Sequence, residues 1–199
     1  MLGAGGTRQL VAAKCGLNSL GLDLRPECTD AGRCAAQELG LSDKAFFYPG
    51  DMRTVPKTVA AFAKKRKRQR LPAPRYGGMF TSIPFWKLET YDAAKNHDGL
   101  LEHCGTFAAF VEDMTTSLKS TVEVLAENAW VLVHCGPMRD GGRRCDLPFE
   151  IKKILQDECN LELVDEVSTA QLAPYDSTYT QACSAASWLR IHLQCLHED

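Results

Sequence analysis

The alternation of short apolar runs with longer segments of helical periodicity is the feature that most constrains the fold of this chain. The run at residues 129–135 (AWVLVHC) is almost continuously apolar, as expected of a strand that is covered on both faces of a sheet. Similar runs, bounded by turn residues, predict strands at residues 18–24, 45–48, 78–81, 129–135 and 161–167. Residues 188–196 are interpreted as a last strand, with a short helix as the alternative.

Helices are predicted between most of these runs. The clearest begins at Phe107, because apolar residues recur every three to four positions from there to Leu125. Other helices are predicted at residues 8–15, 26–39, 59–68 and 148–158, with loops at residues 87–99 and 141–144. Strands that alternate with helices predict an α/β fold with a parallel, doubly wound sheet. The 199 residues, 45% of them hydrophobic, suffice for one core, so residues 1–199 are predicted to form a single domain.

Charge and cysteine content limit the classes of function. The net charge of −2 gives no strong overall attraction to nucleic acid. The nine cysteines are scattered without a C-x-x-C pair, so no metal site is expected and free thiols in a reducing compartment are predicted. The sequence shows no signal peptide and no apolar run of membrane-spanning length. We therefore expect an intracellular protein that makes no membrane contact.

A glycine-rich turn precedes the first helix. Gly3 and Gly5 lie just before residues 8–15, where glycines let a ligand approach the backbone and a helix N-terminus favours electron-rich groups. A tight turn without a ligand explains the same residues equally well.

Two carboxylates follow predicted strands. Asp23 ends the strand at residues 18–24, about 20 residues after the glycine turn, which is the position of a residue that binds ribose hydroxyls. Asp51 follows the next strand and is placed to accept a hydrogen bond from an adenine amino group. The alternatives are a surface carboxylate for Asp23 and a turn residue for Asp51.

The stretch at residues 80–86 (FTSIPFW) combines a hydroxyl, a proline and aromatic rings just after a predicted strand. Open α/β sheets place their chemistry at the carboxyl ends of their strands. We interpret this stretch as the site that holds a planar, nitrogen-bearing ring for modification. His134, at the end of another predicted strand, is interpreted as structural.

These residues resemble the S-adenosylmethionine-dependent DNA methyltransferases that modify exocyclic amino groups, the N4-cytosine and N6-adenine type. The catalytic motif of that family, (Asp/Asn/Ser)-Pro-Pro-(Tyr/Phe/Trp), is similar to Ser82-Ile83-Pro84-Phe85. Its cofactor motif Phe-x-Gly-x-Gly falls on residues 1–5, and its next cofactor motif falls on Gly50-Asp51-Met52. The resemblance extends from residue 2 to about residue 167.

The resemblance implies a Rossmann-like fold, S-adenosylmethionine as cofactor and DNA as partner, with no metal. Gly3, Gly5, Asp23, Asp51 and Met52 would bind the cofactor. The target base would be flipped out of its stack and lie against Phe85. Ser82 and the carbonyl of Ile83 would then accept hydrogen bonds from its amino group, at cytosine N4 or adenine N6.

The sequence departs from the family in two places. Ile83 replaces the first proline of the motif, which removes a rigid φ angle. The strand that should precede the glycine turn is missing, so a gap is expected in the middle of the sheet. Either the sequence is truncated at its start or the chain is a degenerate copy. With no separate target-recognition domain, reading of a DNA sequence would need a protein partner, or the substrate would be single-stranded.

A basic run contrasts with the neutral average. Its charged residues are Lys64, Lys65, Arg66, Lys67, Arg68 and Arg70. It is interpreted either as a solvated helix face, as a phosphate contact that acts together with Trp86, or as a nuclear import signal. The expected location is accordingly cytoplasmic or nuclear.

Three other functions compete with the leading hypothesis. Related motifs serve methylation of RNA bases or of protein glutamine. A catalytically inactive, methyltransferase-like subunit that binds nucleic acid or a partner would explain Ile83 and the missing strand. A Rossmann-type dehydrogenase fits least, because residues 3–6 (GAGG) lack the third glycine of its fingerprint.

Overall fold

Helices and strands alternate along most of the chain in the computed structural model, which describes residues 6–70, 73–84, 86, 104–140, 142–169 and 186–192. The helical elements are α1 Thr7–Lys14, α2 Pro26–Glu38, the 3-10 turn η1 Met52–Thr54, α3 Val55–Arg68, α4 Phe107–Val122, α5 Leu147–Lys153 and the π-helical continuation η3 Ile154–Glu158. The strands are β1 Ser19–Asp23, β2 Ala45–Pro49, β3 Tyr76–Ser82, β4 Leu125–Cys135, β5 Met138–Asp140, β6 Arg143–Cys145, β7 Glu162–Thr169 and β8 Ala186–His192. Each predicted helix and strand is present, within a few residues of its expected bounds.

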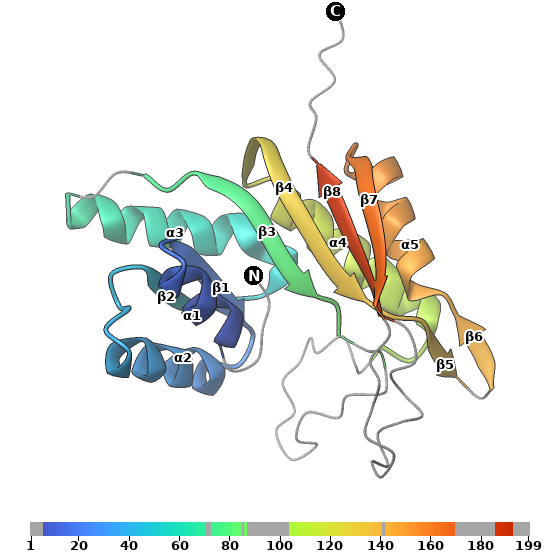
Figure 1. Ribbon diagram of the computed structural model, residues 1–199, viewed down its shortest axis with the longest axis horizontal. Coiled ribbons are helices and arrows are strands. Elements are labelled where there is room, and N and C mark those ends of the chain that lie inside the picture. The colour runs from blue at the N-terminus through green and yellow to red at the C-terminus, as the bar shows by residue number, and fades with distance from the viewer. Residues whose placement is uncertain are drawn as a thin grey trace, which may run out of the picture.

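The strands form a split α/β sheet (Figure 1). β1 and β2 pair in parallel, and so do β3 and β4. β8 lies between β4 and β7 and runs antiparallel to both. The parallel prediction is therefore confirmed within each of the pairs β1–β2 and β3–β4. The strand predicted at residues 188–196 is present up to residue 192, where the described residues end, and it runs antiparallel to its neighbours.

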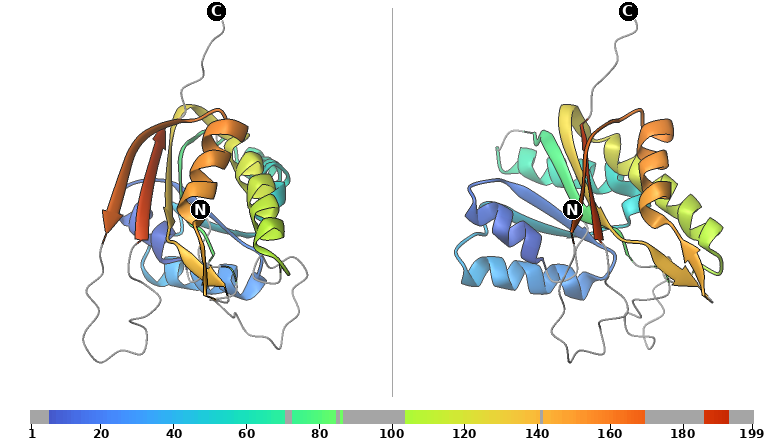
Figure 2. Two further views of the ribbon diagram at one scale, coloured as in Figure 1. Left: turned by 90° about the vertical axis from the view of Figure 1, so that its right-hand side faces the viewer. Right: turned by 45° about the vertical axis from the view of Figure 1, so that its right-hand side comes forward.

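The middle of the sheet is interrupted, as the sequence predicted. β1 pairs only with β2, and β3 only with β4, so among the described residues no strand joins β1 to β3. Figure 2 shows the two pieces of sheet from other sides. The α/β layers nevertheless continue across the interruption, because the main core cluster includes Leu22 of β1, Met79 of β3 and Met52 of η1.

The core lies between the larger piece of sheet and three helices. Alternate residues of β4 follow the period of a strand: Val131 and Val133 are fully buried, whereas Trp130 on the other face is 37% exposed. Phe110, Met114 and Leu118 form the fully buried stripe of α4. Figure 2, left, shows α3, α4 and α5 side by side on this face. The helices α1 and α2 pack instead against β1 and β2.

Two sequence predictions need correction or fall outside the structure. The loop predicted at residues 141–144 contributes instead to a β-hairpin, in which Met138 pairs with Cys145 and Asp140 with Arg143. The loop predicted at residues 87–99 lies outside the described residues. Within the part of the chain that is described, no helix has the length and apolar character of a membrane span.

Candidate functional site

The carboxyl ends of β1 and β2 bring the two predicted cofactor carboxylates into neighbouring loops. The strands are paired up to Asp23 and Pro49. Beyond them, the backbone N–H of Gly50 donates to the carbonyl of Asp23 at 2.9 Å. Asp23 and Asp51 therefore leave the same edge of the sheet, as the sequence predicted.

The carboxylate of Asp23 is held from within its own turn. Its Oδ1 accepts hydrogen bonds from the backbone N–H of Arg25 at 2.9 Å and from Nε of Arg25 at 3.4 Å. The Asp23 side chain is 14% exposed. Since both bonds fall on Oδ1, Oδ2 keeps acceptor capacity for a hydroxyl.

Asp51 is bound more completely, by Arg53. Its Oδ1 accepts from the backbone N–H of Arg53 at 2.8 Å, and its Oδ2 accepts from Nη2 at 2.6 Å. Burial alone would raise the pKa of Asp51, but the hydrogen bonds and charge of Arg53 outweigh it and hold the pKa below its usual value. Arg53 also lies 3.7 Å from Asp113 of α4. Asp51 thus anchors η1 to α4, a role that the sequence did not reveal.

Met52, the next predicted cofactor residue, has its side chain in the core and is 6% exposed. A ligand at this edge would meet its backbone rather than its thioether. Gly3 and Gly5 lie outside the described residues, but Gly6 is the N-cap of α1, with φ at 71°. A Cβ atom on Gly6 would stand 2.6 Å from Cε1 of Phe47, so only glycine fits this approach.

Ser82 ends β3 and lies between two side chains that are distant in the sequence. Nη2 of Arg8, in the first turn of α1, donates to its Oγ at 2.5 Å. The same Oγ lies 3.2 Å from Nδ1 of His134, the β4 residue in register with Ser82. Because Gly6, the N-cap of α1, packs against Phe47 of β2, the Arg8 contact brings the end of β3 toward the carboxyl edge of β1 and β2.

The surroundings of His134 favour the neutral form of its imidazole. Burial, and secondarily the positive charge of Arg8, lower the pKa of its imidazole below the ordinary value. A neutral imidazole accepts a hydrogen bond at one ring nitrogen. Since Arg8 can only donate, the Ser82 hydroxyl accepts from Arg8, and its own proton can go to Nδ1 of His134 in the tautomer that leaves Nδ1 unprotonated.

Ile83 is buried and fills the place of the family's proline. It is 1% exposed, and its backbone N–H donates to the carbonyl of His134 at 3.0 Å. A proline has no N–H to make this bond. The departure from the motif thus adds one hydrogen bond between β3 and β4, beyond the last residue of β3. Pro84 follows it and is half-buried, and Phe85 lies outside the described residues.

Trp86 lies in the core, which corrects its prediction as a nucleic-acid contact. It is 3% exposed, and its Nε1 donates to the carbonyl of Cys104 at 2.7 Å. Its ring packs against Phe107 and Phe110, with centroid distances of 5.6 Å and 6.4 Å. An aromatic residue with its polar atom bonded and its ring covered has no surface left for a base.

The basic run occupies the last turns of α3, where cations also stabilise the helix dipole. Most of its side chains are exposed: Lys64, Lys65, Lys67, Arg68 and Arg70. Arg66 instead lies over the rings of Phe46 and Phe62, 5.7 Å from each centroid. The chain enters β3 only after this run, so the run lies toward the amino end of β3. Ser82 is at the other end of β3, and a strand of seven residues is about 20 Å long.

The sequence missed two of the site's residues, Arg8 and His134. Nothing in the sequence marked Arg8 as a site residue, because a charged residue in an amphipathic helix is ordinarily solvated. His134 carried a signal: once β3 and β4 are taken as parallel neighbours, aligning their carboxyl ends puts His134 beside Ser82.

Comparison with solved structures identifies the fold of this chain, whereas comparison of sequences finds no relative. No profile of a known protein family matches the sequence, and no curated protein matches it significantly. TrmN from Thermus thermophilus is similar in structure with a TM-score of 0.59 and 15% identity, over 96% of this chain and 42% of that chain. Magnesium protoporphyrin IX methyltransferase (ChlM) from Synechocystis PCC 6803, with bound SAM, gives 0.57 and 13%, over 96% of this chain and 67% of that one.

The chain has the Rossmann-like fold of S-adenosylmethionine-dependent methyltransferases. The same fold is found in the [4+2]-cyclase SpnF, with a TM-score of 0.60 and 14% identity, over 97% of this chain and 74% of that one. Because one fold carries different chemistry, the function of this chain has to be argued from the residues at its site.

Proposed function

We propose that this chain binds S-adenosylmethionine and methylates an exocyclic amino group of a nucleic-acid base, at cytosine N4 or adenine N6 in DNA. The observation that carries the proposal is the Ser82 hydroxyl. Arg8 and His134 hold it at the sheet edge that also carries Asp23. A fixed acceptor beside a cofactor site is what transfer to an amino group requires.

The residues at the carboxyl edge fit the cofactor. S-adenosylmethionine supplies an electrophilic methyl group on a sulfonium. Oδ2 of Asp23 is available to ribose hydroxyls, since the bonds from Arg25 fall on Oδ1. Gly6, at positive φ, is the N-cap of α1, and electron-rich groups are favoured at a helix N-terminus. Gly3 and Gly5 would add close backbone approach. Asp51 acts indirectly, because Arg53 occupies both of its oxygens.

Ser82 supports transfer by orienting the acceptor nitrogen. With its proton directed to His134 and one lone pair used by Arg8, its oxygen has a second lone pair for an amino N–H. The carbonyl of Ile83 would take the other amino N–H, and the ring of Phe85 would hold the base. The nitrogen lone pair then points at the methyl carbon, and positioning supplies most of the rate. When bound, the cofactor would supply the methyl group; the proton released from the amino group would pass to the Ser82 hydroxyl as that hydroxyl gives its own proton to His134.

A second candidate is a methyltransferase-like subunit without activity. Two observations favour it. The sheet is interrupted between β1 and β3, and both carboxylate oxygens of Asp51 are already bonded to Arg53. In that case the exposed cations of α3 would be the contact surface for nucleic acid, far from Ser82.

The experiment that separates the two is transfer of a labelled methyl group to oligonucleotides. Single-stranded and duplex DNA and an RNA of the same sequence are incubated with the protein and labelled cofactor, and the bases are analysed after digestion. Label in N4-methylcytosine or N6-methyladenine, lost in Ser82→Ala and kept in the exposed control Ser42→Ala, supports the proposal. Cofactor binding without transfer to any of the three would favour the inactive subunit.

A further inference from the structure

We propose that the outward face of α3 is a track for the phosphate backbone of a nucleic acid, one that leads from the cofactor edge of the sheet to the opposite edge. This surface rests on the proposed function for the class of its partner. Binding along α3 needs no methyl transfer, however, so the two can be tested separately.

The outward face of α3 carries cations from its first turn to its last. Lys57, Lys64 and Arg68 are exposed and stand seven and four residues apart, a spacing that puts them on one face of an α-helix. Lys67 is exposed beside them, and the exposed residues between Lys57 and Lys64 are both alanine. The face is therefore a row of cations without bulky groups between them.

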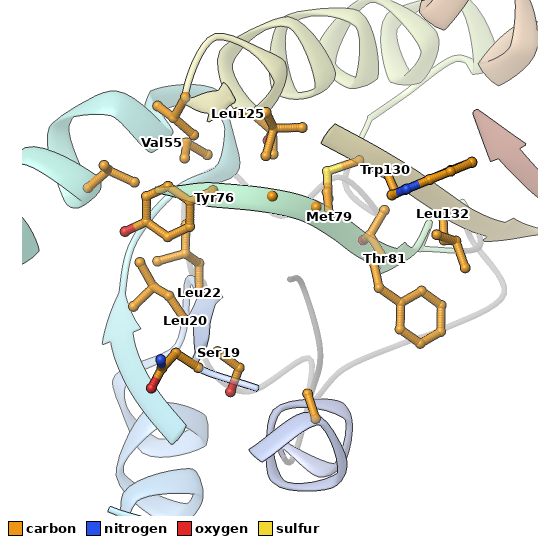
Figure 3. A pocket seen from close by; sticks show the side chains of 18 of the residues that line it. Ser19, Leu20, Leu22, Val55, Tyr76, Met79, Thr81, Leu125, Trp130 and Leu132 are labelled. Atoms are coloured by element: carbon orange, nitrogen blue, oxygen red, sulfur yellow. The ribbon is translucent and has the colours of Figure 1, made fainter. Parts of the chain in front are cut away.

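The opposite face of α3 is inside the protein, which excludes insertion of the helix into a lipid surface. Val55 and Phe62 are buried, and Figure 3 shows Val55 and Tyr76 of β3 on the walls of one internal cavity. A helix that lies in a membrane surface needs a free apolar face. Among the described residues, the exposed large apolar side chains all lie outside α3. The cationic face therefore fits a polyanion in water.

The cations of this face have no carboxylate to neutralise them. The chain carries no acidic residue between Asp51 and Glu89, and none of the described carboxylates pairs with the cations of this face. Elsewhere in the described structure, cations have acidic partners: Arg25–Asp23, Arg33–Asp30, Lys119–Glu158, Arg144–Asp146 and Lys152–Glu166. The positive potential is thus concentrated on α3 although the net charge of the chain is −2.

Helix stability does not account for this row. Lys57 lies in the first turn of α3, where the helix dipole disfavours a cation. Lys64 and Arg68 are four residues apart, so their like charges repel each other. A bound polyanion would offset this repulsion and release its own counterions.

The length and direction of the row fit an extended polyanion rather than a single phosphate. Lys57 and Arg68 are about 16 Å apart along the helix axis, and one strand of B-form DNA presents about five phosphates over that length. Lys57 lines the same groove as Arg53, which holds Asp51 at the carboxyl edge. Arg68 lies at the end of α3, before the amino end of β3. The row therefore connects the cofactor edge with the basic run.

Fluorescence anisotropy over a series of salt concentrations tests the track, with a labelled DNA duplex and its single strand as probes. The variant Lys57→Gln/Lys64→Gln/Arg68→Gln removes three cations that point away from the core. We expect its affinity to fall by about ten-fold or more. Its slope of log K against log salt should become shallower by about 2, because each lost phosphate contact contributes about 0.7–0.9.

The matched control removes the same charge elsewhere. Lys14→Gln/Arg143→Gln/Lys153→Gln changes three exposed cations outside α3 and should keep the wild-type slope. Equal slopes for the two triple variants, or a wild-type chain that binds neither probe, would overturn the track.

Two further measurements separate the track from methyl transfer and from a lipid partner. Ser82→Ala should bind both probes with the wild-type slope, so binding without transfer would count against the proposed function alone. Transfer with an unchanged KM in the α3 triple variant would overturn the track and leave the proposed function standing. Co-sedimentation with anionic phospholipid vesicles that is as tight as DNA binding, and is lost in the α3 triple variant, would assign the face to a membrane and overturn the nucleic acid.

Discussion

The two halves of the carboxyl edge hold their polar groups in different ways. At the ends of β1 and β2, each carboxylate is bound by an arginine two residues further along, Asp23 by Arg25 and Asp51 by Arg53. At the end of β3, Ser82 is bound by Arg8 and His134, which are 74 and 52 residues away in the sequence. Local pairs shape a loop, whereas long-range pairs fix one hydroxyl relative to the rest of the fold. The long-range arrangement at Ser82 is therefore the one suited to orienting a substrate group.

Removing the hydroxyl is the strongest test of this difference. In Ser82→Ala we expect methyl transfer to fall by about 100-fold or more, as when a positioned hydrogen-bonding group is lost. Cofactor affinity should not change, since the cofactor residues belong to the other half. Rates and affinities are compared by labelled transfer and by calorimetry. A parallel loss of cofactor affinity would show that the two halves are not separable.

Placing the proline of the similar motif at position 83 tests what Ile83 contributes. Ile83→Pro removes the N–H that bonds the carbonyl of His134 and the buried apolar side chain. We expect the free energy of unfolding to fall by about 1–3 kcal/mol, measured by urea denaturation. Unchanged stability, or higher activity with full stability, would mean that the isoleucine is a defect rather than an adaptation.

Arg8 is the link between the two halves, so its loss should act on activity more than on cofactor binding. We expect Arg8→Ala to lower the rate of methyl transfer by about ten-fold, as for one charge-assisted hydrogen bond. Lys14→Ala, on an exposed residue of the same helix, is the control. Equal rates for the two variants would remove Arg8 from the site.

The smallest effect concerns pH. Burial and Arg8 keep the pKa of His134 below 6.5, so activity should hold at neutral pH and decline below pH 6.5. A protonated imidazole would donate to Ser82 and fill the lone pair that the substrate needs. His134→Asn keeps an acceptor that does not titrate and should flatten this acid limb of the rate profile. An unchanged acid limb would assign the titration to another group.

The same depressed pKa affects stability with a defined sign. The unfolded chain takes up the His134 proton near pH 6.5, before the folded chain does, so stability is lost as the pH falls from there toward the folded-state value. His134→Asn should lose less stability than the wild type over this interval in urea denaturation. Equal losses in the two proteins would contradict a half-buried His134 whose pKa is lowered in the folded state.

Sequence patterns predicted the elements well because the apolar residues of α4 and β4 follow the periods of a helix and a strand. They placed Asp23 correctly at the end of a strand, because that position depends only on where one strand ends, and its role in cofactor binding stays a prediction. They failed for Trp86, since nothing in the motif shows that its indole bonds the carbonyl of Cys104. They could not place the basic run, whose distance from Ser82 depends on the direction of α3 and β3. The hydrogen bond from Arg8 to Ser82 could not be predicted, because only the complete fold brings these two residues together.

The central claim is that the carboxyl edge of β1 and β2 is a cofactor site, and calorimetric titration with S-adenosylmethionine tests it most directly. The wild-type chain is compared with Asp23→Asn and with Asp43→Asn, an exposed aspartate that serves as control. We expect micromolar binding by the wild type and by Asp43→Asn (on the order of 8 kcal/mol), and none detectable by Asp23→Asn. A folded wild-type chain that binds no cofactor, or equal binding by Asp23→Asn, would contradict the account.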